Sequence, residues 1–178
     1  MADLATQIAR IVGSIAELQR KQANVVRSGK VIEVDAANQR VKVDLGDNGS
    51  SFSTPWIPWT ERAGARKTWN PPSVGELMTV LSPGGEINGN SLAVHGGFTD
   101  ENAPPSANGD ALAFSLGDVA VEVIGGGVTL TVGGVTLSIT GAGLAINGGK
   151  VAHNGTDIGD THKHSGVLSG PVQTGTPV

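Results

Sequence analysis

The feature that most constrains this chain is a series of short alternating segments, separated by glycines, between residues 111 and 160. Apolar and hydroxyl side chains alternate within each segment, as in Val128-Thr129-Leu130-Thr131-Val132, and Gly-Gly pairs lie between several segments. Alternation with a period of two is typical of β-strands that have one apolar and one polar face. Two-residue glycine linkers between such strands favour tight turns. The sequence therefore predicts strands of about five residues joined by minimal turns.

One copy of this segment can bury little apolar surface. Its only aromatic residue is Phe114, and each strand offers two or three aliphatic side chains on one face. Ordering a residue costs roughly 1–2 kcal/mol, and a lone sheet also leaves its edges open. Three copies could bring their apolar faces together around a common axis. We therefore predict a narrow trimeric rod over residues 111–160, in which each chain wraps round its partners. A monomeric hairpin sheet or an aggregation-prone passenger segment is the alternative.

A helix is predicted over residues 3–22, and we assign residues 1–24 to it as a separate segment. Its apolar residues recur at alternating intervals of four and three, which is the a/d pattern of a coiled coil. They are Leu4, Ile8, Ile11, Ile15 and Leu18. Asp3 suits the N-cap, and Arg20 and Lys21 suit the C-terminal end of the helix dipole. This narrow stripe fits either self-association or packing against the chain's own domain.

Residues 25–98 predict a small β domain. Val41, Val43 and Leu45 alternate with polar residues, which indicates a half-buried strand after a turn at residues 35–38. Further strands are predicted at residues 31–34, 77–81 and 92–94. Short strands with one long insertion, at residues 55–72, are compatible with an OB-type barrel. The chain is thus predicted to be all-β apart from its N-terminal helix.

The insertion holds all three tryptophans, Trp56, Trp59 and Trp69. Clustered indoles can form a stacking platform for nucleic acid or sugars, but they can also cover a barrel or a subunit interface. The chain has a formal net charge of −4 and no basic run, which disfavours a nucleic-acid partner. We expect the covering role.

Residues 99–110 predict a linker, because the stiff pair Pro104-Pro105 lies among polar residues. The chain has no cysteine, which excludes disulfides, thiolate metal sites and thiol nucleophiles. It has neither an apolar run of about 18 residues nor a basic-then-apolar leader. We expect synthesis in a bacterial cytoplasm without Sec export.

Residues 161–178, the predicted apex and C-terminal tail, contain the candidate metal ligands. His162 and His164 are two residues apart, so a strand would project both imidazoles to one side and Lys163 to the other. A threefold axis would assemble three such pairs into six nitrogen ligands. Six imidazoles favour an octahedral ion such as Fe(II) over tetrahedral zinc. His95 and His153 lack such a neighbour.

Several motifs resemble the phage baseplate assembly protein V family, which includes the central spikes of contractile-tailed phages and R-type pyocins. They are Gly29-Lys30-Val31-Ile32-Glu33-Val34, Arg40-Val41-Lys42-Val43, Trp56-Ile57-Pro58-Trp59, Trp69-Asn70-Pro71-Pro72-Ser73-Val74-Gly75-Glu76, Leu81-Ser82-Pro83-Gly84-Gly85 and Thr161-His162-Lys163-His164. The resemblance implies an N-terminal OB-fold, a trimeric β-helix and an apex where His162 and His164 of three chains bind one iron ion. Some relatives also hold calcium or chloride on the axis, for which Asp157 and Asp160 are candidate ligands here.

The function that follows is mechanical. We expect a homotrimeric spike at the tip of a phage or bacteriocin baseplate, which contacts tail hub proteins and punctures the bacterial outer membrane during contraction. We expect no enzyme activity and no small-molecule substrate, because six histidines would leave no open position on the metal. An OB-fold binding module and a baseplate adaptor without a piercing role are the alternatives.

Overall fold

The computed structural model describes residues 3–47, 49–160, 162, 163, 166 and 170. The chain divides into two compact units, Met1–Ala103 and Pro104–Val178. The boundary lies inside the segment 99–110 that the sequence predicts as a linker. Each unit is described by itself below.

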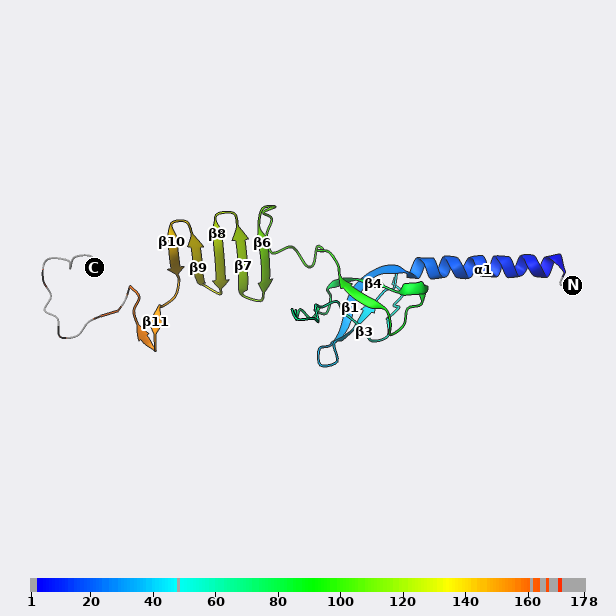
Figure 1. Ribbon diagram of the computed structural model, residues 1–178, viewed down its shortest axis with the longest axis horizontal. Helices are drawn as coiled ribbons and strands as arrows, with labels where there is room; N and C mark the ends of the chain where they lie inside the picture. Colours follow the sequence, from blue (N-terminus) through cyan, green and yellow to red (C-terminus); the bar gives the residue numbers. More distant parts are fainter. Residues whose placement is uncertain (1–2, 48, 161, 164–165, 167–169, 171–178) are drawn as a thin grey trace. The chain divides into compact units, whose positions relative to one another are not determined.

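The first unit begins with the predicted helix, α1, which spans Leu4–Asn24 (Figure 1). Asp3 is its N-cap but makes no side-chain capping bond; its carbonyl accepts a hydrogen bond from the Gln7 amide instead. Lys21 lies in the last turn, as the helix dipole favours. The helix passes into the first strand at Val25, so one continuous segment joins helix and barrel.

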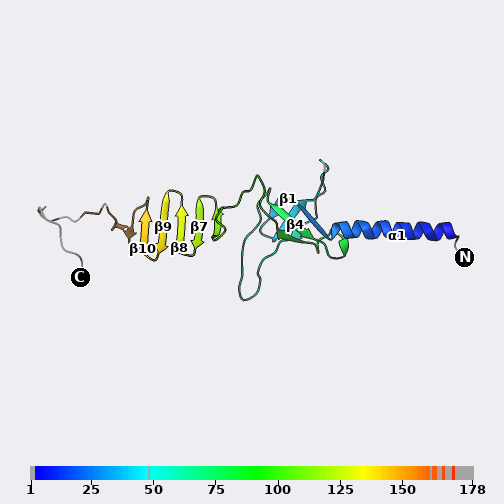
Figure 2. The ribbon, with the colours of Figure 1, turned by 90° about the horizontal axis from the view of Figure 1, so that it is seen from above.

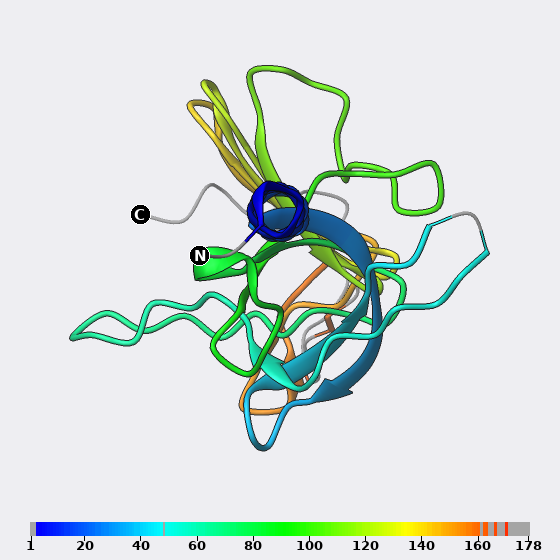
Figure 3. The same cartoon turned by 90° about the vertical axis from the view of Figure 1, so that its right-hand side faces the viewer.

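A five-stranded antiparallel sheet forms the rest of this unit, in the order β3-β2-β1-β4-β5. The strands are β1 (Val26–Asp35), β2 (Arg40–Asp44), β3 (Ile57–Pro58), β4 (Leu77–Leu81) and β5 (Leu92–His95). In Figure 3, which views α1 end on, the long strand β1 curves around the sheet. A bridge between Trp59 and Ala93 links the chain after β3 to β5, so the sheet is nearly closed. This architecture agrees with the predicted OB-type barrel.

The barrel interior holds the hydrophobic core. Val41, Val43 and Leu45 alternate inward as predicted, and each is at most 1% exposed. Val31 and the β4 pair Met78 and Val80 complete the centre of the core. Ser82 and Ser91 are also buried there, and they share a hydrogen bond of 2.8 Å between their hydroxyls. The polar atoms within the barrel are therefore paired, as burial requires.

The second unit contains an antiparallel meander, in which each strand pairs with its neighbours in sequence. Its strands are β6 (Leu112–Leu116), β7 (Val119–Ile124), β8 (Gly127–Val132), β9 (Val135–Thr140) and β10 (Gly143–Asn147). They lie side by side in both Figure 1 and Figure 2. Two-residue turns join them, and Gly117 and Gly133, both with φ 56°, take the first turn position. A type II′ hairpin turn requires glycine at that position.

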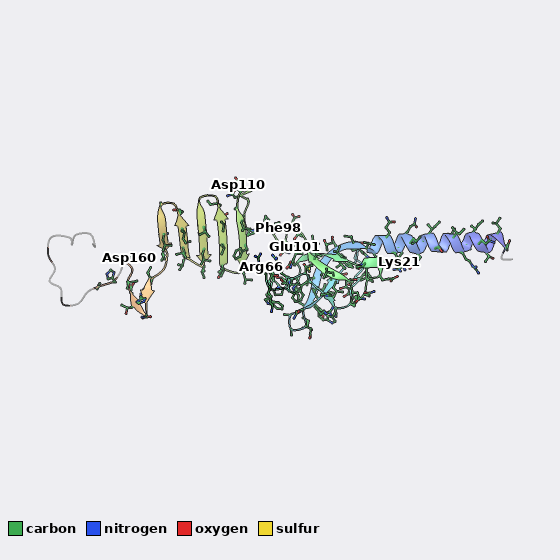
Figure 4. The ribbon with its side chains drawn as sticks, in the orientation of Figure 1. Lys21, Arg66, Phe98, Glu101, Asp110 and Asp160 are labelled. Atoms are coloured by element: carbon green, nitrogen blue, oxygen red, sulfur yellow. The ribbon has the colours of Figure 1, made fainter. Side chains whose placement is uncertain are left out.

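A small hairpin follows, formed by β11 (Ala152–His153) and β12 (Thr156–Asp157). Its turn is Asn154-Gly155, with φ 49° and 82°. Positive φ at both positions is the type I′ turn that Asn-Gly favours. The hairpin precedes Asp160, which is labelled in Figure 4.

Candidate functional site

The meander separates apolar and polar side chains between its two faces. Strand register aligns the apolar residues in three rows across the sheet. The rows are Leu112-Val123-Val128-Ile139-Leu144, Phe114-Val121-Leu130-Leu137-Ile146 and Leu116-Val119-Val132-Val135. The opposite face carries alanine, glycine and polar residues together with Ile124. One whole side of the sheet is therefore a continuous hydrophobic surface.

Within the described part of this unit, nothing covers the apolar face. No described residue there is buried, and Leu116, Phe114 and Leu144 are 83%, 61% and 63% exposed. The segment that precedes β6 reaches the polar face instead, where the Ser106 hydroxyl donates a hydrogen bond of 2.9 Å to Glu122 on β7. Exposed apolar surfaces of this extent mark interaction sites. The candidate functional site of this unit is thus an assembly surface rather than a cleft.

The predicted metal ligands lie after the small hairpin. His162 is described and exposed, whereas His164 lies outside the described residues. The Nδ1 atom of His162 is in hydrogen-bonding contact with the Gly159 carbonyl oxygen. Since a carbonyl can only accept, Nδ1 must carry the proton, and Nε2 of the neutral ring carries the lone pair. Protein histidines that bind a metal through Nε2 commonly make this backbone contact through Nδ1.

His162 therefore fits a role as a metal ligand in chemistry and exposure. Among the described residues, no three His, Asp or Glu side chains come together to hold a metal. Of the acidic candidates, Asp157 accepts a hydrogen bond of 2.9 Å from the Gly159 amide, which shapes the turn before His162. Asp160 is exposed.

The three tryptophans of the barrel unit differ from one another. Trp59 is 6% exposed and belongs to the core, so it covers the barrel interior as expected. Trp69 is 59% exposed and packs against Trp59 with ring centroids 5.7 Å apart. Trp56 is 37% exposed and lies under the Lys42 ammonium, 4.6 Å from its ring centroid. They do not form one shared stacking platform.

Glu61 organises this insertion, a role that the sequence analysis missed. Its carboxylate accepts hydrogen bonds from the Thr68 hydroxyl, the Asn70 amide and the Trp59 indole. These donors, the Thr68 hydroxyl foremost, lower the pKa of Glu61. A groove of about 540 Å³ lies beside it, lined by the tryptophans Trp59 and Trp69 and by Arg40, Arg62 and Lys67 among others. No sequence motif marks Glu61, because its three donors meet only after the loop folds.

Comparison with known proteins identifies the barrel. Residues 27–95 match the family described as the Type VI secretion system and phage-baseplate injector OB domain. This chain is therefore similar to that family over its barrel sheet. It is also similar to the spike protein of Escherichia phage P2, with 36% identity over 111 residues, which make up 62% of this chain and 50% of that protein. The match thus spans half the length of the P2 protein.

These findings agree with the resemblance to the baseplate family seen in the sequence and with its OB domain. The match to the family model begins in β1 and ends at His95, the last residue of β5, so it covers the barrel sheet. In the described part of the chain, no helix is long and apolar enough to cross a membrane.

Proposed function

We propose that this chain is the central spike of a contractile tail baseplate, that it acts as a homotrimer, and that it punctures the bacterial outer membrane when the tail contracts. The observation that carries the proposal is the uncovered apolar face of β6–β10 in a chain whose barrel matches the baseplate injector OB domain. Similarity to a phage P2 protein named for its spike supports the same role.

The trimer follows from what the apolar face requires. Three such sheets placed around an axis would bury their rows of Val, Leu and Ile against one another and would turn the Thr and Ser rows to water. This is the trimeric β-helix that the sequence predicts. Many hydrogen bonds and apolar contacts would have to fail together for such a rod to bend or fray. A narrow, stiff and water-soluble body suits a part that is pushed through a membrane.

The tip of the rod is the second element of the proposal. His162 and His164 of three chains would hold one iron ion on the axis, with Asp157 and Asp160 as candidate ligands for an additional axial calcium. Bound there, the iron would supply coordinate bonds that join three chain ends where a hydrophobic core has no room. The backbone contact of His162 Nδ1 supports this role, because it directs Nε2 to be the ligand.

The OB barrel would attach the spike to the tail hub, which places the protein at the baseplate tip of a virion or of a tail-like bacteriocin. We expect neither a nucleic acid nor a small molecule as its partner. A binding-module role draws little support, since Trp59 is buried and Glu61 is occupied within its own loop. An adaptor role without piercing differs only in what the tip does.

The deciding experiment combines metal analysis with light-scattering mass on purified full-length protein. The wild type should be a trimer with one iron per three chains. His162→Ala/His164→Ala should lose the iron, whereas His153→Ala, a change in an exposed histidine of β11, should keep it. Particles that carry the double variant should then assemble but kill or infect poorly, which separates a piercing tip from an adaptor. A monomer, or one zinc per chain, would contradict the proposal.

A further inference from the structure

The helix α1 carries a second uncovered apolar surface. None of its residues is buried, and its a/d residues Leu4, Ile8, Ile11, Ile15 and Leu18 are 49–69% exposed. Val12 beside them is 59% exposed and widens the stripe. Most of the stability of a helix in a protein comes from packing of its apolar face. Among the described residues, nothing in the chain packs on the stripe.

The helix does contact its own barrel, but only near its C-terminal end and through polar residues. The Lys21 backbone lies against η1 (Pro83–Gly85), so closely that a Cβ on Gly85 would come within 2.1 Å of the Lys21 carbonyl oxygen. Arg20 and Lys21 form ion pairs with Glu86, of 3.1 and 3.3 Å. Lys21 is labelled in Figure 4, at the end of α1. These contacts fix which side of the helix faces the barrel.

That side is not the apolar one. Successive helix residues advance by about 100°, so all five a/d residues lie within about 40° of Leu4 around the axis. By the same measure Arg20 lies roughly 160° from Leu4, on the opposite side of the helix. Lys21 lies roughly 100° from Leu4, at the flank of the stripe. The barrel therefore holds α1 by its polar side and leaves the stripe turned away. Packing against its own domain, one of the two options left by the sequence, is thereby excluded for the described residues.

We propose that the apolar stripe of α1 packs against the same stripe of two further copies, as a parallel, in-register three-stranded coiled coil. The inference rests on the proposed trimer and adds to it a separate assembly surface. Ile8, Ile11 and Ile15 place isoleucine at both a and d positions in the middle of the stripe, a pattern that favours three strands over two. In a trimer with the barrels outside, three stripes that face away from their barrels face the axis.

The charges fit a homotypic bundle as well. In a parallel, in-register bundle the flanking g positions of one helix face the e positions of its neighbour, so like charges at these positions would repel one another. The flanking residues Ala5, Gln7, Val12, Ser14 and Gln19 are uncharged. Lys21, the one charged flanking residue, is paired with Glu86 of its own chain. A copy of this chain therefore matches the stripe without any complementary partner.

Disulfide trapping tests this inference in the full-length protein, which has no cysteine of its own. In Ile11→Cys, three thiols would meet in one layer, so mild oxidation should link two of every three chains into dimers and leave the third unlinked. Arg10→Cys is the matched control, because its side chain lies roughly 100° from that of Ile11 around the axis. It should stay unlinked under the same conditions.

Other outcomes would overturn the inference. If light scattering gives a trimer but Ile11→Cys does not form disulfide-linked dimers, the coiled coil is refuted and the spike trimer stands. The same result is expected if another protein binds the stripe. A monomeric mass would refute both. Linking of all chains into dimers would indicate a two-stranded bundle and refute the threefold one.

A second readout does not depend on thiols. Ile8→Asp/Ile11→Asp should lower the far-UV helical signal, because α1 unfolds when its stripe is no longer packed. Thr6→Asp/Ala9→Asp adds the same charge on the opposite side and should leave that signal unchanged. Equal loss of signal in both double variants would contradict the proposed packing.

Discussion

Replacing Ile139 and Leu144 by threonine should weaken the proposed trimer while each chain keeps its sheet. The two side chains face each other across β9 and β10 and are 49% and 63% exposed in one chain. Full burial of such a side chain is worth about 1.5–3 kcal/mol, so covering the exposed parts would contribute about 2 kcal/mol per chain and ~6 kcal/mol per trimer. Threonine keeps the strand propensity of both positions.

The size of the effect follows from this free energy. At about 1.4 kcal/mol per factor of ten, the association constant of the trimer should fall roughly 10⁴-fold. The midpoint concentration of a monomer–trimer equilibrium varies as the inverse square root of that constant, so it should rise about 100-fold. Sedimentation equilibrium over a dilution series measures this midpoint, with moderate urea added equally to all samples if the wild type does not dissociate.

The control places the same residue on the other face of the same strands. Ser138 and Ala145 are a directly paired couple on β9 and β10, and Ser138→Thr/Ala145→Thr should leave the midpoint unchanged. If both double variants shift the midpoint equally, the apolar face is not the assembly surface. A wild type that is monomeric throughout the series would also refute the reasoning.

Three further predictions concern the barrel unit. Met78→Ala removes a side chain that is 0% exposed in the core and should cost about 2–5 kcal/mol of unfolding free energy in urea; a loss below ~1 kcal/mol would contradict the packing described. Gly85→Ala should lower the melting temperature more than Gly84→Ala, because both residues have positive φ but only a Cβ at Gly85 meets the Lys21 backbone; equal effects would argue against that contact. Glu61→Gln should destabilise the protein at neutral pH. Because the pKa of Glu61 is lowered by folding, its contribution is full at neutral pH and is lost as the pH falls through the folded pKa. The melting temperatures of wild type and variant should therefore converge once the pH is below that folded pKa.

Local patterns in the sequence were sufficient to predict most elements of the barrel and the sheet. The alternation of Val41, Val43 and Leu45 placed their side chains in the core, and the spacing of the a/d residues placed α1. Such patterns succeed because period and turn chemistry are properties of neighbouring residues. The turns of the meander were also predicted from the sequence, because a position with positive φ, such as Gly133, favours glycine.

What the sequence left open depends on contacts between distant residues. Whether α1 turns its stripe toward or away from the barrel was decided by Gly85, far along the chain, which accepts the close approach of the Lys21 backbone. The separate roles of Trp59 and Trp69 depended on Glu61 and its three donors, which no local pattern reveals. The apex site stays a prediction, since His162 is one part of a ligand set that would come from three chains.

The meander also allows the length of its sheet to change in fixed steps. Neighbouring strands are about 4.8 Å apart, and β7, β8 and their turns form one unit that restores both strand direction and facing. Copying residues 119–134 in tandem would add two rungs and about 10 Å without changing the register of any other strand. Deleting them would shorten the sheet by the same step. The length of the sheet could thus vary among such proteins by gain or loss of whole hairpins, two strands at a time, while the strands at both ends of the sheet stay unchanged.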